Sequence, residues 1–265
     1  MDISADAPIL FLDSGVGGLS ILAEVRRLLP DAPVIYCADR AALPYGDKSE
    51  AEIAARVCGL LGRLSERYRP RLVCIACNTA STIALGMVRE VLEIPIVGTV
   101  PAIKPAAAMT RTGTIGLLGT AATIRQRYVD DLEAEFAQGK ELVRHAAPAL
   151  VAAAEELSRG GKVDASVFER AIQGLRAKAT GTIDTIVLAC THFPLVEEEL
   201  ARAAGPDVRF IDGAQGIARR IAYLTRGQDF ARTRPDFAIV TGDGPDDDAL
   251  LPVLERHGID AILRL

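Results

Sequence analysis

Two cysteines stand where this sequence could support proton transfer or nucleophilic attack. Cys77 and Cys190 each close an apolar, strand-like run with the dipeptide Ala-Cys, and small polar residues follow each of them. A thiolate is a competent base or nucleophile when a helix N-terminus or a cationic neighbour lowers its pKa. Both cysteines are expected to precede a helix, so this applies to each. A lone strand cysteine is more often a small buried hydrophobe, but the repeated context of this pair favours a chemical role.

Polar residues accompany both thiols. His192 lies two residues after Cys190 and could tune that thiol or donate a proton. Asp13 begins the loop Asp-Ser-Gly-Val-Gly-Gly between an expected strand and an expected helix, where backbone N–H groups suit a carboxylate as well as a phosphate. The loop departs from the dinucleotide-binding pattern because Ser20 occupies the place of the third glycine. A tight turn that needs glycine is an additional reading of the same loop.

The cysteines, His192 and the lysines also bear on three other kinds of chemistry: metal binding, thiol redox chemistry and pyridoxal phosphate catalysis. Cys74 and Cys77 form a C-x-x-C, and Cys190 with His192 would complete a zinc quartet. Positions 74 and 77 of one strand point to opposite faces, which disfavours a zinc site. A disulfide oxidoreductase would need its cysteine pair at the start of a helix and not across the interior of a strand. The lysines stand in surface-type contexts, so pyridoxal phosphate is not indicated.

The elements that position these residues alternate between short apolar strands and amphipathic helices. Strands are expected over residues 9–12, 33–37, 72–76, 96–97, 114–118, 185–189 and 237–240. Helices are expected over residues 19–29, 49–67, from 79 to 92, and over 124–136, 165–179 and 249–257. Ser49 and Glu52 have the spacing of a capping box. Such alternation predicts an α/β fold with parallel sheets covered on both faces.

The same order of elements occurs twice. Ser14 precedes Cys77 by 63 residues, and Thr120 precedes Cys190 by 70 residues. We therefore expect two similar α/β domains, each with one cysteine at the carboxyl end of a strand, where open α/β sheets bind ligands. Residues 1–99 with 208–265 would form the first domain, and residues 100–207 the second.

Composition and charge narrow the classes of function. Hydrophobic residues make up 49% and charged residues 25%, as in ordinary globular proteins. Thirty basic and 35 acidic residues leave no basic footprint for nucleic acid. Apolar stretches of about nine residues are far shorter than the ~20 that cross a bilayer. An acidic N-terminus without a signal-like basic region and an odd number of cysteines favour a reduced, cytoplasmic protein with no membrane partner.

Taken together, the motifs resemble those of the bacterial glutamate racemases, in the aspartate/glutamate racemase superfamily. The matching stretches run in family order over nearly the whole chain: residues 12–19 (LDSGVGGL), Asp39 with residues 44–46 (PYG), residues 76–81 (ACNTAS), 94–98 (IPIVG), 119–124 (GTAATI), 190–195 (CTHFPL), 211–212 (ID) and 241–243 (TGD). Each stretch alone is a weak signal, whereas the ordered set is specific.

The resemblance implies a cofactor-independent racemisation of glutamate by two bases. The two domains would be related by a pseudo-two-fold axis, with the active site in the cleft between them. Cys77 would serve D-glutamate with help from Asp13, and Cys190 would serve L-glutamate with help from His192 and Glu155. The implied substrate contacts are Asp13, Ser14, Tyr45, Gly46, Asn78, Thr79, Thr120, Thr123, Thr191 and His192. No metal is implied, and the enzyme would be a homodimer that supplies D-glutamate for peptidoglycan.

The sequence also departs from the family pattern. Glu155 falls at the place of a family glutamate, but the residues around it differ. Arg40 stands where a threonine is usual, and Phe193 where a tyrosine is usual. About eight residues precede the first expected strand, so the extension that binds a cell-wall precursor in some members is missing and no such activation is expected.

Competing functions remain open from sequence alone. The nearest rival is a relative acting on aspartate, a hydantoin or a malonate-type acid, although a decarboxylase of this superfamily would keep only one of the two cysteines. A non-catalytic module that binds small dicarboxylates predicts saturable binding without exchange of the α-proton. A thiol redox or zinc-binding protein predicts bound metal or a changed thiol count.

Overall fold

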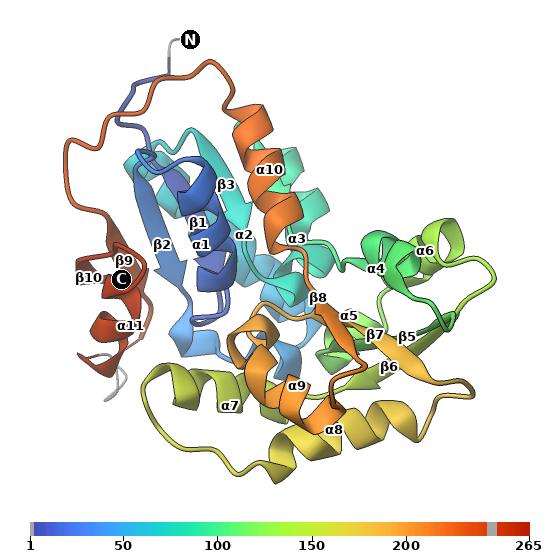
Figure 1. Cartoon of the computed structure of the whole chain (residues 1–265). Coiled ribbons are helices and arrows are strands. Elements are labelled where there is room, and N and C mark those ends of the chain that lie inside the picture. The colour runs from blue at the N-terminus through green and yellow to red at the C-terminus, as the bar shows by residue number, and fades with distance from the viewer. Residues whose placement is uncertain (1–2, 243–247) are drawn as a thin grey trace. The chain divides into compact units, whose positions relative to one another are not determined.

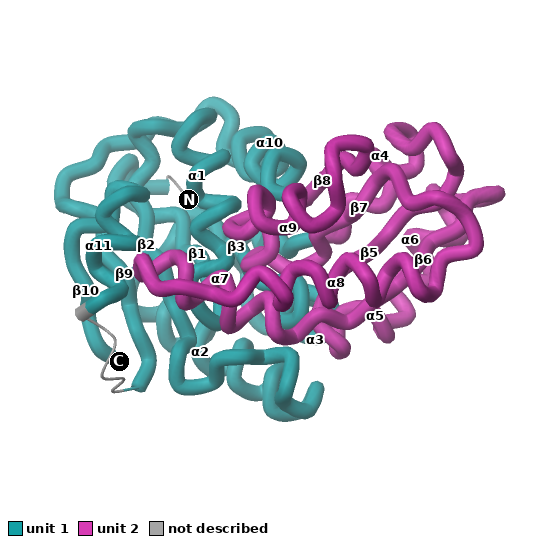
Figure 2. The backbone as a smooth tube through the Cα atoms, turned by 60° about the horizontal axis from the view of Figure 1, so that its bottom comes forward, with its two compact units in different colours: residues 1–99, 214–265 teal, residues 100–213 magenta. Residues whose placement is uncertain are grey.

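Figure 1 shows the computed structural model of the chain, which describes residues 3–242 and 248–265. Over this part, the chain divides into unit 1, residues 1–99 with 214–265, and unit 2, residues 100–213 (Figure 2). The chain returns to unit 1 at residue 214, whereas the sequence analysis expected the first domain to resume at residue 208. Residues 208–213 lie in unit 2 because β8 (Arg209–Ile211) pairs with β7 (Ile183–Ala189).

Unit 1 is built on a parallel sheet. In chain order its strands are β1 (Ile9–Asp13), β2 (Val34–Ala38), β3 (Leu72–Ile75), β4 (Ile96–Gly98), β9 (Phe237–Val240) and β10 (Ala261–Arg264). Its helices are α1 (Leu19–Leu28), α2 (Glu50–Tyr68), α3 (Asn78–Val91), α10 (Ala214–Leu224) and α11 (Leu251–Glu255), with 3₁₀ turns η1 (Arg40–Ala42), η2 (Tyr45–Asp47) and η4 (Asp248–Leu250). The strand order is β10–β9–β2–β1–β3–β4.

Unit 2 contains a second parallel sheet, in the order β6–β5–β7–β8. Its remaining strands are β5 (Thr114–Gly119) and β6 (Glu141–Ala146). Its helices are α4 (Ile103–Met109), α5 (Ala121–Ile124), α6 (Arg127–Phe136), α7 (Ala149–Ser158), α8 (Ser166–Arg176) and α9 (Glu197–Ala204), with the 3₁₀ turn η3 (Phe193–Val196). The predicted class, two α/β units with mainly parallel sheets, is confirmed.

The two sheets repeat one topology. The order β2–β1–β3–β4 in unit 1 corresponds to β6–β5–β7–β8 in unit 2, and every one of these pairs is parallel. Under this correspondence β3, which leads to Cys77, matches β7, which leads to Cys190. The repeat inferred from the loop-to-cysteine spacing therefore exists as a repeat of strand order.

Helices bury both faces of the first sheet, as its apolar strands require. One face packs on α2 and α3 in a cluster that includes Leu12, Val73, Val57 and Ala84. Helices α1 and α10 pack together in front of the sheet in Figure 1. The expected capping box begins α2, since the Ser49 hydroxyl accepts from the Glu52 N–H and the Glu52 carboxylate accepts from the Ser49 N–H. No helix in the described ranges is long and apolar enough to span a bilayer.

Some elements differ from the prediction. The helix expected over 124–136 begins later, as α6 at Arg127, because its N-cap Gln126 has an extended backbone; the short helix α5, which ends at Ile124, was not predicted. Strand β6 was not predicted, since this edge strand is half-exposed and carries Arg144 and His145 in place of an apolar run. Helices α4, α7, α9 and α10 and the short strands β8 and β10 were not predicted either.

The side chains of His145 and His257 are half-buried. Burial lowers the pKa of His145, and the charge of Lys178 adds to this effect. Burial also lowers the pKa of His257, with further contributions from Arg256 and Arg26. Each ring is therefore harder to protonate in the folded protein than in the unfolded chain, where the pKa is about 6.5.

These shifts predict a loss of stability on mild acidification. Below pH ~6.5 the unfolded chain binds protons at these histidines before the folded protein does, so stability present above that pH falls as pH decreases. Thermal unfolding followed at pH 8, 6.5 and 5 should show a falling midpoint. In the variant with His145→Gln and His257→Gln the slope should be shallower. An equal slope in variant and wild type would contradict this account.

Candidate functional site

The loop after β1 places two of the predicted site residues. Asp13 ends the strand fully buried, and its Oδ1 accepts a hydrogen bond of 2.7 Å from the Gly15 N–H. The Tyr36 hydroxyl donates to the Gly15 carbonyl at 2.8 Å, which fixes the turn from the neighbouring strand. Ser14, also buried, therefore lies on a loop whose backbone is held on two sides.

Gly18 lets this loop approach the end of β3. A Cβ on Gly18 would lie 2.8 Å from the Ala76 Cβ and 3.0 Å from the Tyr36 hydroxyl oxygen. The backbone of Gly18 is right-handed, so the requirement is for space and not for a left-handed conformation. The loop that carries Asp13 is thereby seated directly against the residue that precedes Cys77.

Gly18→Ala is expected to displace this loop, because Ala76 has no flexible side chain that could move aside. Overpacking of this kind costs about 1–3 kcal/mol of stability. Activity that depends on this loop should fall by about tenfold or more, since small misplacements of site residues are costly. Gly59→Ala on α2 is the matched control, because nothing lies within 4 Å of its added Cβ. Equal stability and turnover of the two variants would contradict the packing argument.

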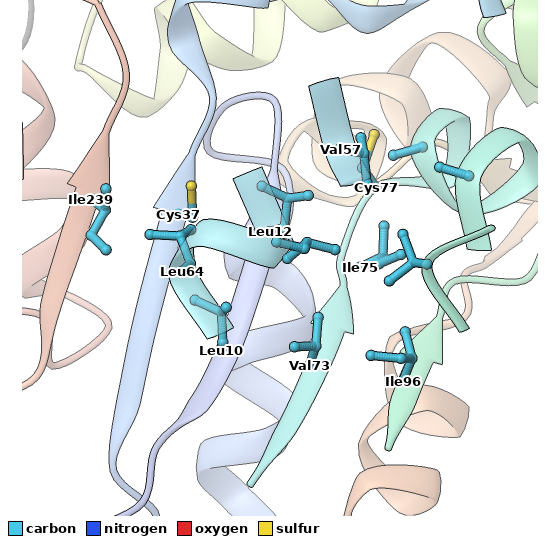
Figure 3. Packing of buried hydrophobic residues seen from close by; sticks show 14 of the residues in the cluster. Leu10, Leu12, Cys37, Val57, Leu64, Val73, Ile75, Cys77, Ile96 and Ile239 are labelled. Carbon is cyan, nitrogen blue, oxygen red and sulfur yellow. The ribbon is translucent and has the colours of Figure 1, made fainter. Parts of the chain in front are cut away.

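Cys77 lies at the carboxyl end of β3 and is the N-cap residue of α3. Its side chain extends past the strand, in one buried cluster with Val57 and Ile75, and the residue is 6% exposed (Figure 3). Asn78 and Thr79 form the buried first turn of α3, whose N–H groups and dipole favour an anion. This confirms that a helix begins directly after Cys77.

The turn η2 holds Tyr45 and Gly46 beside α3. Tyr45 is buried, and its hydroxyl donates a 2.7 Å hydrogen bond to Oδ2 of Asp39. Burial raises the pKa of Tyr45, and negative charge on Asp39 and on Cys77 raises it further. The phenol is therefore a hydrogen-bond donor to Asp39, and the proton of the hydroxyl is directed at that carboxylate.

In unit 2, the loop after β5 carries Thr120 and Thr123. Thr120 is the N-cap of α5, and its hydroxyl oxygen accepts from the Thr123 N–H at 3.1 Å. The two hydroxyl oxygens are 3.0 Å apart, and both residues are buried. Under the correspondence of strand order, β5 matches β1. Thr120, which directly follows β5, therefore matches Ser14, which directly follows β1.

Cys190 follows β7 and is 6% exposed, the same fraction as Cys77. Thr191 and His192 are buried beside it in sequence. The expected helix does not begin here, because the 3₁₀ turn η3 follows first and α9 begins only at Glu197. The helix-dipole argument therefore holds for Cys77 and is wrong for Cys190.

A buried histidine–carboxylate pair follows Cys190. His192 Nε2 lies 2.9 Å from Oε1 of Glu155, which comes from α7, and both side chains are almost fully buried. The second Glu155 oxygen lies 3.3 Å from Nη1 of Arg159. A carboxylate that binds one ring nitrogen selects the tautomer and orientation of an imidazole. The structure thus brings Glu155 to His192, a pairing that the spacing of 37 residues could not indicate.

The predicted site residues therefore form two half-sites. The Cys77 half-site in unit 1 consists of Asp13, Ser14, Tyr45, Gly46, Cys77, Asn78 and Thr79. The Cys190 half-site in unit 2 consists of Thr120, Thr123, Glu155, Cys190, Thr191 and His192. Asp243 of the C-terminal motif lies outside the described residues.

Sequence reasoning missed the partners that hold these residues. Asp39 was noted only as part of a motif, and Arg56 and Arg159 gave no signal, because arginines on helices normally face solvent. Cys74 is buried inside β3, and burial raises the pKa of its thiol. Within the described ranges no cluster of three metal-ligating side chains is found, and none of the cysteines there forms a disulfide.

Comparison with known proteins places the chain in a family. The profile of the Asp/Glu/hydantoin racemase family matches residues 19–221. The glutamate racemase of Sphingopyxis alaskensis is 60% identical over 97% of each chain, and that of Photorhabdus laumondii is 41% identical over 99% of this chain and 92% of the relative. The crystal structure of Escherichia coli glutamate racemase with L-glutamate and the activator UDP-MurNAc-Ala superposes with a TM-score of 0.91, at 40% identity and 98% coverage of both chains. The chain therefore belongs to the Asp/Glu/hydantoin racemase family, and these similarities are to its glutamate racemases.

Proposed function

We propose that this chain interconverts L- and D-glutamate by 1,1-proton transfer between two thiols. The observation that carries the proposal is the pair Cys77 and Cys190, which follow corresponding strands of two sheets with the same strand order. Inversion of a carbon centre needs one proton-transfer group on each face of that carbon. A relative at 60% identity that is named a glutamate racemase supports glutamate as the substrate.

The proposed reaction neither gains nor loses protons. With D-glutamate, the Cys77 thiolate removes the α-proton and becomes a thiol, and the electron pair of the C–H bond moves into the carboxylate-stabilised planar intermediate. The Cys190 thiol then donates its proton to the opposite face and is left as the thiolate. With L-glutamate the two thiols exchange roles. Each turnover leaves the proton count unchanged, and the reaction consumes no co-reactant and asks for no cofactor.

The half-sites offer groups that suit a dicarboxylate. In the Cys77 half-site, we assign Asp13, Ser14, Asn78, Thr79 and the Tyr45–Gly46 turn to the substrate, with N–H groups at the start of α3 binding a carboxylate. In the Cys190 half-site, we assign Thr120, Thr123, Thr191 and His192. Asp13 would assist Cys77, and the Glu155–His192 pair would assist Cys190. Exclusion of water during the reaction would strengthen these contacts.

The biological setting follows from the same proposal. D-glutamate is a building block of peptidoglycan, so we assign the enzyme to cell-wall synthesis in the cytoplasm. We expect it to act as a homodimer, without nucleic-acid or membrane partners.

The test is α-proton exchange and racemisation by the purified chain with no cofactor added. L- and D-glutamate are incubated separately in D₂O, with inversion followed by circular dichroism and deuterium incorporation by NMR. Both enantiomers should racemise and gain α-deuterium. Turnover of L-aspartate and not of glutamate would move the substrate assignment to aspartate. Saturable glutamate binding without exchange would support a binding module and overturn the enzyme proposal.

A further inference from the structure

An ion pair between the buried Asp39 and the half-exposed Arg56 ties together the loop that carries Tyr45 and Gly46. The Asp39 carboxylate is 0% exposed and lies just after β2. Arg56 of α2 binds it with two nitrogens: Nε contacts Oδ2, and Nη2 donates to Oδ1 at 2.6 Å. The Tyr45 hydroxyl donates to Oδ2, and the Thr241 hydroxyl donates to Oδ1. Burial alone would raise the pKa of Asp39, but these hydrogen bonds outweigh burial and lower it.

These contacts hold residues 40–48, here called the Tyr45 loop, against two other segments of unit 1. Helix α2 contributes Arg56, and the end of β9 contributes Thr241. The Ala41 N–H is directed at both the carbonyl and the hydroxyl oxygen of Thr241, at 3.1 and 3.2 Å. Asp39 accepts hydrogen bonds from Tyr45, Arg56 and Thr241. Loss of the Asp39 carboxylate or of Arg56 would therefore release the loop at several points at once.

The Tyr45 loop, which contributes Tyr45 and Gly46 to the Cys77 half-site, lies against α3. Turn η2 packs on α3, whose N-cap is Cys77, and Tyr45 and Cys77 belong to the same buried cluster. Negative charge on Cys77 influences the Tyr45 phenol directly. Movement of the loop would therefore change the distance between Gly46 and the Cys77 thiol.

We propose that Arg56 and Asp39 are positioning residues for the Cys77 half-site, in that their ion pair holds the Tyr45 loop where substrate must bind. This role rests on the proposed racemase function. It is a positioning role because Arg56 acts through Asp39 and Tyr45. A buried carboxylate that loses its cation is left uncompensated, so removal of Arg56 should drive Asp39 and the loop toward solvent.

A second ion pair on a buried carboxylate of the same unit provides a control. Arg26 Nη2 lies 2.5 Å from Oδ2 of Asp236, which is nearly fully buried. Asp236 directly precedes β9 and accepts from the N–H of Val34, the first residue of β2, at 2.7 Å. The Arg26–Asp236 pair therefore sits at the opposite end of these parallel strands from the Arg56–Asp39 pair. Its loss should lower stability without touching the Cys77 half-site.

The first measurement is steady-state kinetics of wild type, Arg56→Gln, Arg56→Lys and Arg26→Gln with both enantiomers of glutamate. In Arg56→Gln, KM should rise about tenfold while kcat changes by less than about threefold, the signature of lost binding without lost chemistry. Arg56→Lys should fold like wild type and recover part of the effect, because lysine keeps the charge but not the two-pronged geometry. Arg26→Gln should keep the wild-type KM.

The second measurement does not depend on activity. Trypsin can cut after Arg40 and Lys48, which are half-buried in the Tyr45 loop. Mass spectrometry of early fragments should show cleavage at these two residues about fivefold faster or more in Arg56→Gln than in wild type, since local opening controls cleavage. Arg26→Gln should show the wild-type rate at these residues, even where its thermal midpoint is lower.

The outcomes separate this inference from the proposed function. If the wild type is active and both Arg56 variants keep the wild-type KM and the wild-type rate of loop cleavage, the positioning role is overturned. The proposed racemisation is unaffected by that outcome. If wild type fails to turn over glutamate, the proposed function is wrong, and loop cleavage alone decides whether Arg56 holds the loop. Where Arg56→Gln does not fold, Arg56→Lys decides, and wild-type KM and cleavage in that variant would overturn the proposal.

Discussion

Cys77→Ser and Cys190→Ser are each expected to lower the rate of glutamate racemisation by about a thousandfold or more, since a positioned acid–base group contributes ~10²–10⁴ to the rate. Serine nearly keeps the shape of the side chain, but its hydroxyl is far too weak an acid to form the base at neutral pH. Circular dichroism of either enantiomer measures the loss. Cys58→Ser, at a half-exposed position on α2, is the control and should retain wild-type turnover.

Isotope exchange distinguishes the two thiols. Under the proposed mechanism, Cys77 in the Cys190→Ser variant can still remove the α-proton of D-glutamate and return a solvent deuteron to the same face. D-glutamate should therefore gain deuterium without inversion, and Cys77→Ser should do the same with L-glutamate. Exchange with the opposite preference would reverse the assignment of the thiols to the enantiomers. More than a tenth of wild-type racemisation in either variant would contradict the two-base mechanism.

The second large effect is expected at the buried Glu155–His192 pair. Glu155→Gln and His192→Gln should each reduce kcat by about 10–100-fold, because in the proposed mechanism the carboxylate orients the imidazole and the imidazole assists proton transfer at Cys190. The double variant should lose little more than the more damaged single variant, as expected for residues that act as a unit. Steady-state racemisation with both enantiomers gives these values.

Isotope effects are needed to show which of the two thiols the Glu155–His192 pair assists. L- and D-glutamate are equally stable, so kcat/KM must be the same in both directions and cannot show which thiol is impaired. Slower transfer at Cys190 should instead raise the substrate deuterium isotope effect with L-[2-²H]glutamate and lower it with the D-enantiomer. Glu156→Gln is the control, since Glu156 is half-exposed on the same helix and also pairs with Arg159. The reverse pattern, a raised isotope effect with the D-enantiomer and a lowered one with the L-enantiomer, would place the pair on the other thiol.

The site residues on strand ends were accessible from sequence because their signals are local. An apolar run that stops at Ala-Cys marks the end of a buried strand, and both Cys77 and Cys190 were correctly placed at strand ends in this way. The capping box at Ser49 is equally local, since the two residues that form it are three positions apart. The resemblance to racemases rests on ordered short motifs of the same kind.

Errors arose where neighbouring elements decide the structure. A helix was expected directly after Cys190 by analogy with Cys77, but the chain forms η3 first. Edge strand β6 has half-exposed polar residues, so its pairing with β5 leaves no apolar run in the sequence. The unit boundary after Gly213 depends on the pairing of β8 with β7, a contact between segments over twenty residues apart.

The sequence by itself determined the alternation of strands and helices, the repeated Ala-Cys ends and the small polar residues beside them, because each of these depends on residues within a few positions. Tertiary structure alone decided that Glu155 meets His192, that Tyr45 directs its hydroxyl at Asp39, and that Arg56 and Thr241 hold the same carboxylate. Asp39 and Thr241 are 202 residues apart, and they meet only because β2 and β9 are neighbours in one sheet. Such contacts form when burial makes an unpaired charge costly, and no local pattern records which distant side chain will satisfy it.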